Sequence, residues 1–162
     1  MLIGIFSDVH DNLTNLRAML DAYIARGIQT LIFCGDFCSP IPLREMLTFP
    51  GEIHAVFGNG DGDRFTMLKM AANHPQMLLH GEFAELELDG VKIAVTHYPF
   101  YAQALARTGD YQAVFSGHTH EQHVQYFGGC VWLNPGDVMG WKGRSTYAVY
   151  DTDANQAEII TL

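Results

Sequence analysis

The sequence lacks a long apolar run and a leader-like start. No apolar segment approaches the roughly 18 residues that a membrane-spanning helix needs. The first residues have no basic segment and reach Asp8 at once, which is not the pattern of a secretory signal peptide. Because 48% of the 162 residues are hydrophobic and only 17% are charged, a disordered chain is also excluded. We therefore expect a soluble protein that forms a single domain over residues 1–162.

Cysteine is scarce. The three cysteines, Cys34, Cys38 and Cys130, are odd in number and lack the spacing of a disulfide framework. Free thiols are typical of a reducing compartment, so we expect a cytoplasmic location. The pair Cys34 and Cys38 could begin a zinc site, but no second cysteine pair follows it. We favour their interpretation as small buried or half-buried residues.

Positive charge is scarce as well. Nine basic residues stand against 18 acidic ones, for a net charge of −9, and lysine and arginine form no cluster. This argues against a surface that reads the nucleic-acid backbone through many basic contacts, and we expect neither nucleic acid as the main partner nor a membrane. An acidic protein can still bind phosphate groups if metal ions supply the positive charge.

Short apolar runs alternate with segments of helical periodicity in the first half of the chain. The runs at 2–6, 30–34 and 53–57 are too short for helices and predict buried strands. Helices are expected from Leu13 to a stop at Gly27, over 39–48 and over 63–72. The alternation predicts βαβ units around a largely parallel sheet.

The second half of the sequence is richer in strands. A hairpin is expected from 83–88 and 91–96 around Asp89-Gly90, followed by a helix over 98–107 and a strand over 113–116. The remaining strands, expected at 123–127, 130–133, 147–150 and 158–162, suggest a β-meander. Together the two halves predict an α/β fold with two packed sheets flanked by helices.

Five polar motifs each follow directly on a predicted strand. They are Asp8-x-His10, Gly35-Asp36, Gly58-Asn59, His97 and Gly117-His118-Thr119-His120. Ligands of α/β sheets bind beyond the carboxyl ends of the strands, so the motifs can converge on one rim. In an extended segment the first and third residues point to the same side, as expected for the two motifs with paired donors. The two carboxylates, one amide and four imidazoles suit Mn²⁺, Fe, Zn²⁺ or Ni²⁺ better than Ca²⁺ or Mg²⁺. Seven donors fit two ions that share a bridging carboxylate.

In this order the motifs resemble those of the calcineurin-like metallophosphoesterase superfamily, which run Asp-x-His, Gly-Asp, Gly-Asn-x-Asp/Glu, His and Gly-His-x-His. The short single-domain chains of the YfcE-type phosphodiesterase branch are the nearest match. The resemblance covers residues 8–120, and the turn Asn134-Pro-Gly136 extends it. Together with the pattern of elements, it implies a four-layer αββα sandwich with two mixed β-sheets flanked by helices.

The resemblance also implies which residues bind the ions. One ion would be held by Asp8, His10, Asp36 and His120, and the other by Asp36, Asn59, His97 and His118. Such ions lie about 3.5–4 Å apart and generate a hydroxide that attacks the phosphorus of a small phosphate ester. Manganese is the expected ion, with nickel, zinc or iron as alternatives. Asp36, Asn59 and His118 are expected to act in catalysis as well.

The sequence departs from the phosphatases of the superfamily at Gly60, where they often have a histidine that protonates the leaving group. Short phosphodiesterase relatives also lack that histidine, so Gly60 implies weak leaving-group assistance rather than inactivity. Four residues are further candidates for substrate contact: Asn12, Asp61, Tyr98 and Arg144. Each also has a plainer interpretation, as a turn residue for the first two, a helix start for Tyr98 and a solvated loop charge for Arg144.

The other histidines, His54, His74, His80 and His123, are expected to be structural or solvent-facing. A binding module is the alternative to an enzyme, because the resemblance extends to the retromer scaffold subunit, a non-catalytic protein-binding scaffold on the same fold. Loss of activity there goes with loss of metal-site residues, whereas all seven positions here keep competent donors. We therefore predict a phosphoesterase that hydrolyses diesters, with monoesters as a second substrate class. The resemblance alone suggests a homodimer or homotetramer.

Overall fold

The computed structural model describes all 162 residues and contains two β-sheets. The first sheet has the strand order β11-β10-β1-β2-β3-β4. Its strands are β1 (Leu2–Phe6), β2 (Thr30–Phe33), β3 (Glu52–Ala55), β4 (Met77–Leu79), β10 (Thr146–Asp151) and β11 (Gln156–Thr161). Strands β1 to β4 run parallel, and β10 and β11 add an antiparallel edge, so this sheet is mixed.

The second sheet has the order β5-β6-β7-β9-β8. Its strands are β5 (Phe83–Leu88), β6 (Val91–Thr96), β7 (Ala113–Phe115), β8 (Gln122–Phe127) and β9 (Cys130–Pro135). The three inner strands are parallel, and each edge strand is the antiparallel partner of a hairpin, so this sheet is mixed too.

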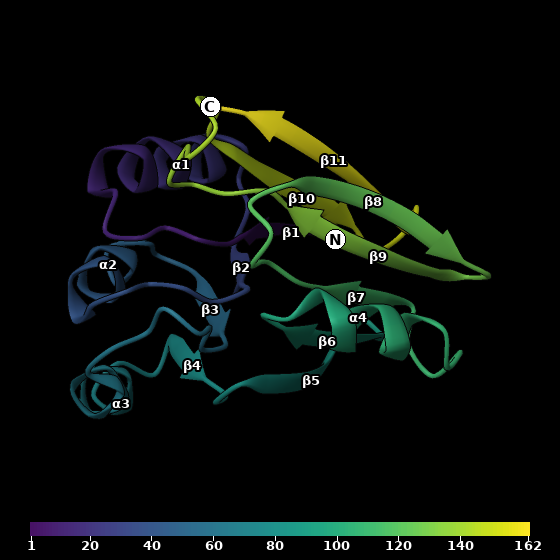
Figure 1. Cartoon of the computed structure of the whole chain (residues 1–162), viewed down its shortest axis with the longest axis horizontal. Helices are drawn as coiled ribbons and strands as arrows, with labels where there is room; N and C mark the ends of the chain where they lie inside the picture. Colours follow the sequence, from purple (N-terminus) through teal and green to yellow (C-terminus); the bar gives the residue numbers. More distant parts are fainter.

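Helices cover the outer faces of both sheets. In Figure 1, α1 (Leu13–Ala25), α2 (Pro40–Met46) and α3 (Arg64–Ala72) lie together on one side, and α4 (Pro99–Ala106) lies over the second sheet. The hydrophobic cluster under the first three helices includes Met19, Leu43 and Met67. A second cluster, between the sheets, includes Ile5 and Phe115, and a smaller one lies under α4. The predicted four-layer αββα sandwich is confirmed. No helix combines the length and the apolar character that crossing a bilayer requires.

Two expectations about the strands were wrong. Strand β4 was missed, because Met77–Leu79 is too short for its periodicity to show. The C-terminal strands do not form one meander: β8 and β9 pair in the second sheet, whereas β10 and β11 pair in the first. Strand β10 is buried over nearly its whole length because it lies between β1 and β11 rather than at an edge.

Two histidines pair across β3 and the end of β4. His54 Nδ1 lies 3.0 Å from His80 Nε2, and the rings stack at 14°. On the other side of the His54 ring, Nε2 lies 3.3 Å from a Glu52 carboxylate oxygen. Burial lowers the pKa of His80, and the neighbouring His54 lowers it further. The pair is therefore held with His80 neutral.

This pair predicts a loss of stability in acid. As pH falls from about 6.5, the unfolded chain protonates His80 before the folded chain does, so the free energy of unfolding of the metal-free protein falls. The variant His80→Gln keeps a polar side chain without this titration, and its free energy of unfolding should fall less. Urea unfolding of both proteins at pH 7.5 and pH 5.0 checks this. An unchanged difference between them at the two pH values would refute the assignment.

Candidate metal centre

The five motifs meet at one rim, where the carboxyl ends of five strands come together. The motifs of Asp8, Asp36 and Asn59 follow β1, β2 and β3 of the first sheet, while His97 and His118 follow β6 and β7 of the second. Hydrogen bonds join the segments. The Asp8 N–H donates to the Gly35 carbonyl at 3.0 Å, and the His118 N–H donates across the sheets to Asp8 Oδ2 at 3.0 Å.

The motif backbones are tight turns rather than extended segments. Asp8, His10, Asp36, His118 and His120 all have positive φ, between 42° and 75°. Such left-handed backbone is uncommon for residues with a side chain and is often found at functional sites. The extended geometry assumed for the paired donors was therefore wrong. As a result, His118 and His120 turn to different partners.

The first group of donors surrounds the buried carboxylate of Asp8. Its Oδ1 lies 3.6 Å from His10 Nε2 and 3.5 Å from His120 Nε2. Asp36 Oδ2 lies 3.4 Å from the same His10 nitrogen. Asp8 Oδ1 and His10 Nε2 are buried and have no hydrogen-bond partner, which is costly for polar atoms unless something else binds them.

The second group shares Asp36 with the first. Asp36 Oδ2 lies 3.4 Å from His97 Nε2, which lies 3.1 Å from Asn59 Oδ1. His118 Nδ1 lies 2.7 Å from the same Asn59 oxygen and 3.3 Å from His97 Nε2. Ligands placed 2.0–2.2 Å from one ion are themselves about 3–3.5 Å apart, so both groups have the spacing of a coordination shell. The residues present thus fit two divalent metal ions.

Three of the histidines have an Nδ1 partner that orients the imidazole ring. His97 Nδ1 lies 2.8 Å from the Cys34 carbonyl oxygen, and His10 Nδ1 lies 3.0 Å from Cys38 Sγ. His120 Nδ1 lies 2.7 Å from Asp137 Oδ2. These partners leave each Nε2 directed at the cluster.

Asp137 was missed by the sequence reasoning. It is 2% exposed, and it also accepts hydrogen bonds from the N–H groups of Gly140 and Trp141, each at 3.1 Å. Its position directly after Asn134-Pro-Gly136 was the one available signal.

The two carboxylates also act on the charge state of the histidines. Burial alone would lower the pKa of His97, but the carboxylates of Asp36 and Asp8 raise it overall. The pKa of His10 is raised first by its contact with Asp8, and Asp36 adds to the effect. The centre therefore carries concentrated negative charge that attracts cations.

Two motif glycines are required by close approach. A Cβ atom on Gly58 would lie 2.1 Å from Asp36 Oδ1. One on Gly117 would lie 1.9 Å from Ser7 Oγ and 2.6 Å from Asp8 Oδ2. Any side chain at these positions would displace a carboxylate of the centre.

Two candidate substrate residues bind backbone instead. Asn12 caps α1, since its side chain accepts from the Asn15 N–H at 3.1 Å and donates to the Met139 carbonyl at 2.9 Å. The Asp61 carboxylate accepts from the N–H groups of Gly58 at 2.7 Å and Cys38 at 3.0 Å. These contacts favour support of the loops around the centre.

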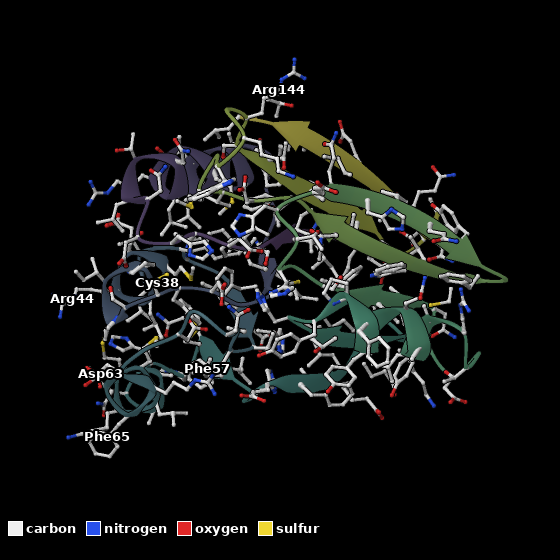
Figure 2. The ribbon with its side chains drawn as sticks, in the orientation of Figure 1. Cys38, Arg44, Phe57, Asp63, Phe65 and Arg144 are labelled. Carbon is white, nitrogen blue, oxygen red and sulfur yellow. The ribbon has the colours of Figure 1, made fainter.

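The other two candidates lie near different histidines of the centre. The ring of Tyr98 lies 5.3 Å from that of His97 and 5.7 Å from that of His118. Arg144 projects outward from the loop before β10 (Figure 2). With Lys142 and His120 it lines a polar hollow of about 250 Å³.

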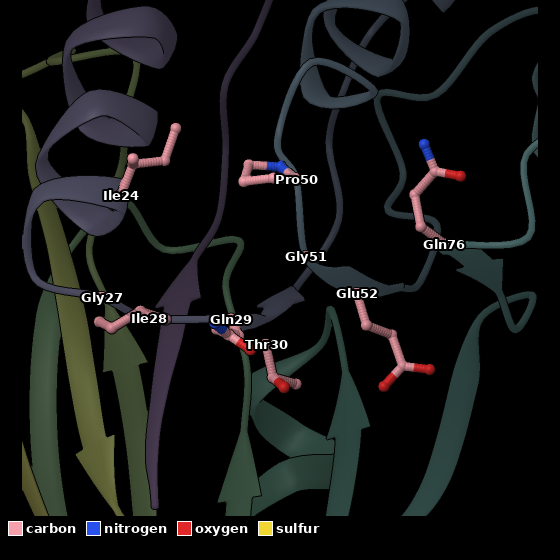
Figure 3. A pocket seen from close by; sticks show the side chains of 9 residues that line it. All are labelled: Ile24, Gly27, Ile28, Gln29, Thr30, Pro50, Gly51, Glu52 and Gln76. Carbon is pink, nitrogen blue, oxygen red and sulfur yellow. The ribbon is translucent and has the colours of Figure 1, made fainter.

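A larger hollow lies far from these residues. It measures about 580 Å³ and lies between the end of α1 and the starts of β2 and β3, at the opposite end of the strands (Figure 3). Its lining includes Gly27, Gln29 and Gly51, and Glu52 is its one ionisable side chain. Nothing in this lining resembles the donor cluster.

Comparisons with known proteins agree with this geometry. Residues 1–155 match the family described as calcineurin-like phosphoesterase superfamily domain. A phosphodiesterase of Methanocaldococcus jannaschii is 30% identical over 165 residues, which cover 100% of this chain and 99% of that protein. The solved structure of an archaeal phosphodiesterase, also 30% identical, superposes with a TM-score of 0.93 over 100% of both chains. The phosphoesterase YfcE of E. coli, at 18% identity, shares the fold with a TM-score of 0.71 over 99% of this chain and 98% of that one. The chain belongs to the calcineurin-like phosphoesterase superfamily.

Proposed function

We propose that the chain is a metal-dependent phosphodiesterase that hydrolyses small phosphate esters, with monoesters as a second substrate class. The observation that carries the proposal is the pair of buried, unpartnered atoms, Asp8 Oδ1 and His10 Nε2, beside the shared carboxylate of Asp36. The full-length similarity to a phosphodiesterase supports the reaction class.

The proposed ligands form two sets that meet at Asp36. One set is Asp8, His10, Asp36 and His120, and the other is Asp36, Asn59, His97 and His118. Manganese is the ion proposed for activity, with nickel, zinc or iron as alternatives, because the nitrogen and oxygen donors suit these metals.

The solvent exposure of each proposed ligand suggests its role in the reaction. Two divalent ions held here would supply a water-derived nucleophile and positive charge for the phosphoryl oxygens. Asp8 and Asp36 are buried, whereas Asn59 and His118 are exposed at the rim. Asn59, His118 and Asp36 are therefore the proposed catalytic residues. The exposed side chains of Asn59 and His118 would face the phosphoryl group, and the buried Asp36 carboxylate would supply the negative charge that holds the ions below it.

The surroundings of the centre complete the proposal. Tyr98 and Arg144 are proposed substrate contacts, while Asn12 and Asp61 are proposed to support the loops of the centre. Gly60 offers no acid for the leaving group; its N–H instead donates to Asp36 Oδ1 at 2.7 Å. We also propose a single domain over residues 1–162, a cytoplasmic location in view of the free thiols, and a homodimer or homotetramer.

The decisive experiment is hydrolysis of bis-p-nitrophenyl phosphate by metal-stripped protein, with Mn²⁺, Ni²⁺, Zn²⁺ or Mg²⁺ added back. Turnover should depend on added metal, and His97→Ala should lower it by at least about 100-fold, because a charge-stabilising ligand is lost. His74→Ala, a histidine outside the centre, is the matched control and should keep wild-type turnover. Absence of turnover with every metal, despite measured metal binding, would favour the non-catalytic scaffold.

A further inference from the structure

A third hollow opens beside Tyr98. It measures about 400 Å³ and lies between α4 and the paired strands β5 and β6. Phe83, Tyr98 and Tyr101 supply aromatic walls, and Ala104 and Leu105 of α4 complete them. A cavity of about 150 Å³ is large enough for benzene, so this hollow has room for a single or fused aromatic ring.

Tyr98 links the hollow to the metal centre, because it lines the hollow and its ring also lies beside two histidines of the centre. This residue directly follows His97, and its ring packs against the rings of His97 and His118, at 5.3 and 5.7 Å. The ring of Tyr101 follows at 6.0 Å from that of Tyr98, in an edge-on arrangement. A group attached to a phosphoryl unit at the centre would therefore meet this aromatic wall next.

Exposure and charge indicate what the hollow accepts. Phe83 is 44% exposed and Tyr101 58% exposed, so large aromatic surface faces solvent here. The acidic side chain at the margin, Glu82, is paired with Arg64 at 2.7 Å. No unpaired charge remains in the lining. The polar hollow beside His120, with its two basic residues, has the opposite character.

We propose that the Tyr98 hollow is a subsite for an aromatic substituent of the substrate, so that the preferred esters carry an aryl or similar flat apolar group on the phosphate. This inference rests on the proposed function. It assigns specificity to the α4 face of the rim, with Tyr98 and Tyr101 as residues that bind the substituent.

Phosphonates test the subsite without turnover, since their carbon–phosphorus bond is not hydrolysed. Phenylphosphonate and methylphosphonate are titrated into the Mn²⁺-loaded protein by calorimetry. Burial of the ring should make phenylphosphonate bind at least about tenfold more tightly. Ala104→Phe fills the hollow from an exposed helix position and should abolish the preference for phenylphosphonate. Gln103→Phe adds the same ring outside the lining and should keep the preference.

The outcomes separate the subsite from the activity. Equal affinities of the two phosphonates for the wild-type protein, or a preference that survives in Ala104→Phe, would overturn the subsite. Turnover of bis-p-nitrophenyl phosphate in the same preparation would then leave the proposed function standing. If neither phosphonate binds and no diester is hydrolysed, the metal centre and the subsite are both overturned.

Discussion

Replacement of Asp36 by asparagine is expected to lower kcat for diester hydrolysis by about 10³-fold, the upper range for loss of one preorganised electrostatic group. Asp36 Oδ2 lies 3.4 Å from His10 Nε2 and 3.4 Å from His97 Nε2, so this carboxylate belongs to both donor groups. Asparagine has the same size and can still accept from the Gly60 N–H, but it lacks the negative charge. The variant should therefore fold normally. It should bind metal poorly at both positions, because the shared negative charge is missing.

The surroundings of Asp36 keep its carboxylate ionised. Burial by itself would raise the pKa of Asp36, but the contact with His97, its charge and the Gly60 N–H outweigh burial and lower the pKa below its ordinary value. The carboxylate is thus ionised at neutral pH before any ion binds. Stability contributed by this shift is present above the unfolded-state pKa and is lost as pH falls through the folded-state value.

Three measurements check the Asp36 prediction: metal content, kcat and thermal unfolding of the metal-free protein. The matched control is Asp21→Asn, an exposed carboxylate on α1. This control should match the wild-type protein in all three measurements. A kcat for Asp36→Asn within tenfold of wild type, at full metal content, would show that Asp36 does not join the two groups.

The second large effect is expected at Asp137. Asp137→Asn should weaken binding of the ion at His120 by about 10- to 100-fold, the usual cost of losing a partner behind a metal-binding histidine. Asp137 Oδ2 lies 2.7 Å from His120 Nδ1, which fixes the ring with Nε2 toward Asp8. An amide at this position lacks the charge that makes the imidazole a stronger ligand. Excess metal should restore most of the activity, since Asp137 does not itself face the substrate.

A double-mutant cycle separates this positioning role from general destabilisation. Manganese titrations are compared for the wild-type protein, Asp137→Asn, His120→Ala and the double variant. If Asp137 acts through His120, its substitution should add little once that imidazole is absent. Equal losses of affinity in both backgrounds would assign Asp137 to the fold of its loop instead.

The convergence of the motifs on one rim could be predicted from the sequence, because each motif directly follows a short apolar strand. The run before Asp8 and the one before Asp36 are both buried parallel strands, whose carboxyl ends must meet. The turn conformation of the motifs was not predictable, since positive φ at His118 or His120 leaves no mark in composition.

Long-range contacts account for the rest of what was missed. Asp137 reaches His120 across 17 positions of sequence, and one acidic residue in a loop looks like any other until the chain is folded. The crossing from β9 to β10 was hidden for a similar reason. Alternation of apolar residues shows that a strand is half-buried but not which sheet it joins.

The candidate metal centre also links the two sheets of the fold. Asp8, Asp36 and Asn59 follow strands of the first sheet. His97 and His118 follow strands of the second sheet, so each proposed ion would have ligands from both sheets. An ion that binds only this closed arrangement stabilises it by mass action, in proportion to the logarithm of its concentration. With the proposed ions bound, the resistance of the sandwich to unfolding would therefore depend on the supply of metal. In a metal-poor environment, the protein would lose its activity and part of the tie between its sheets together.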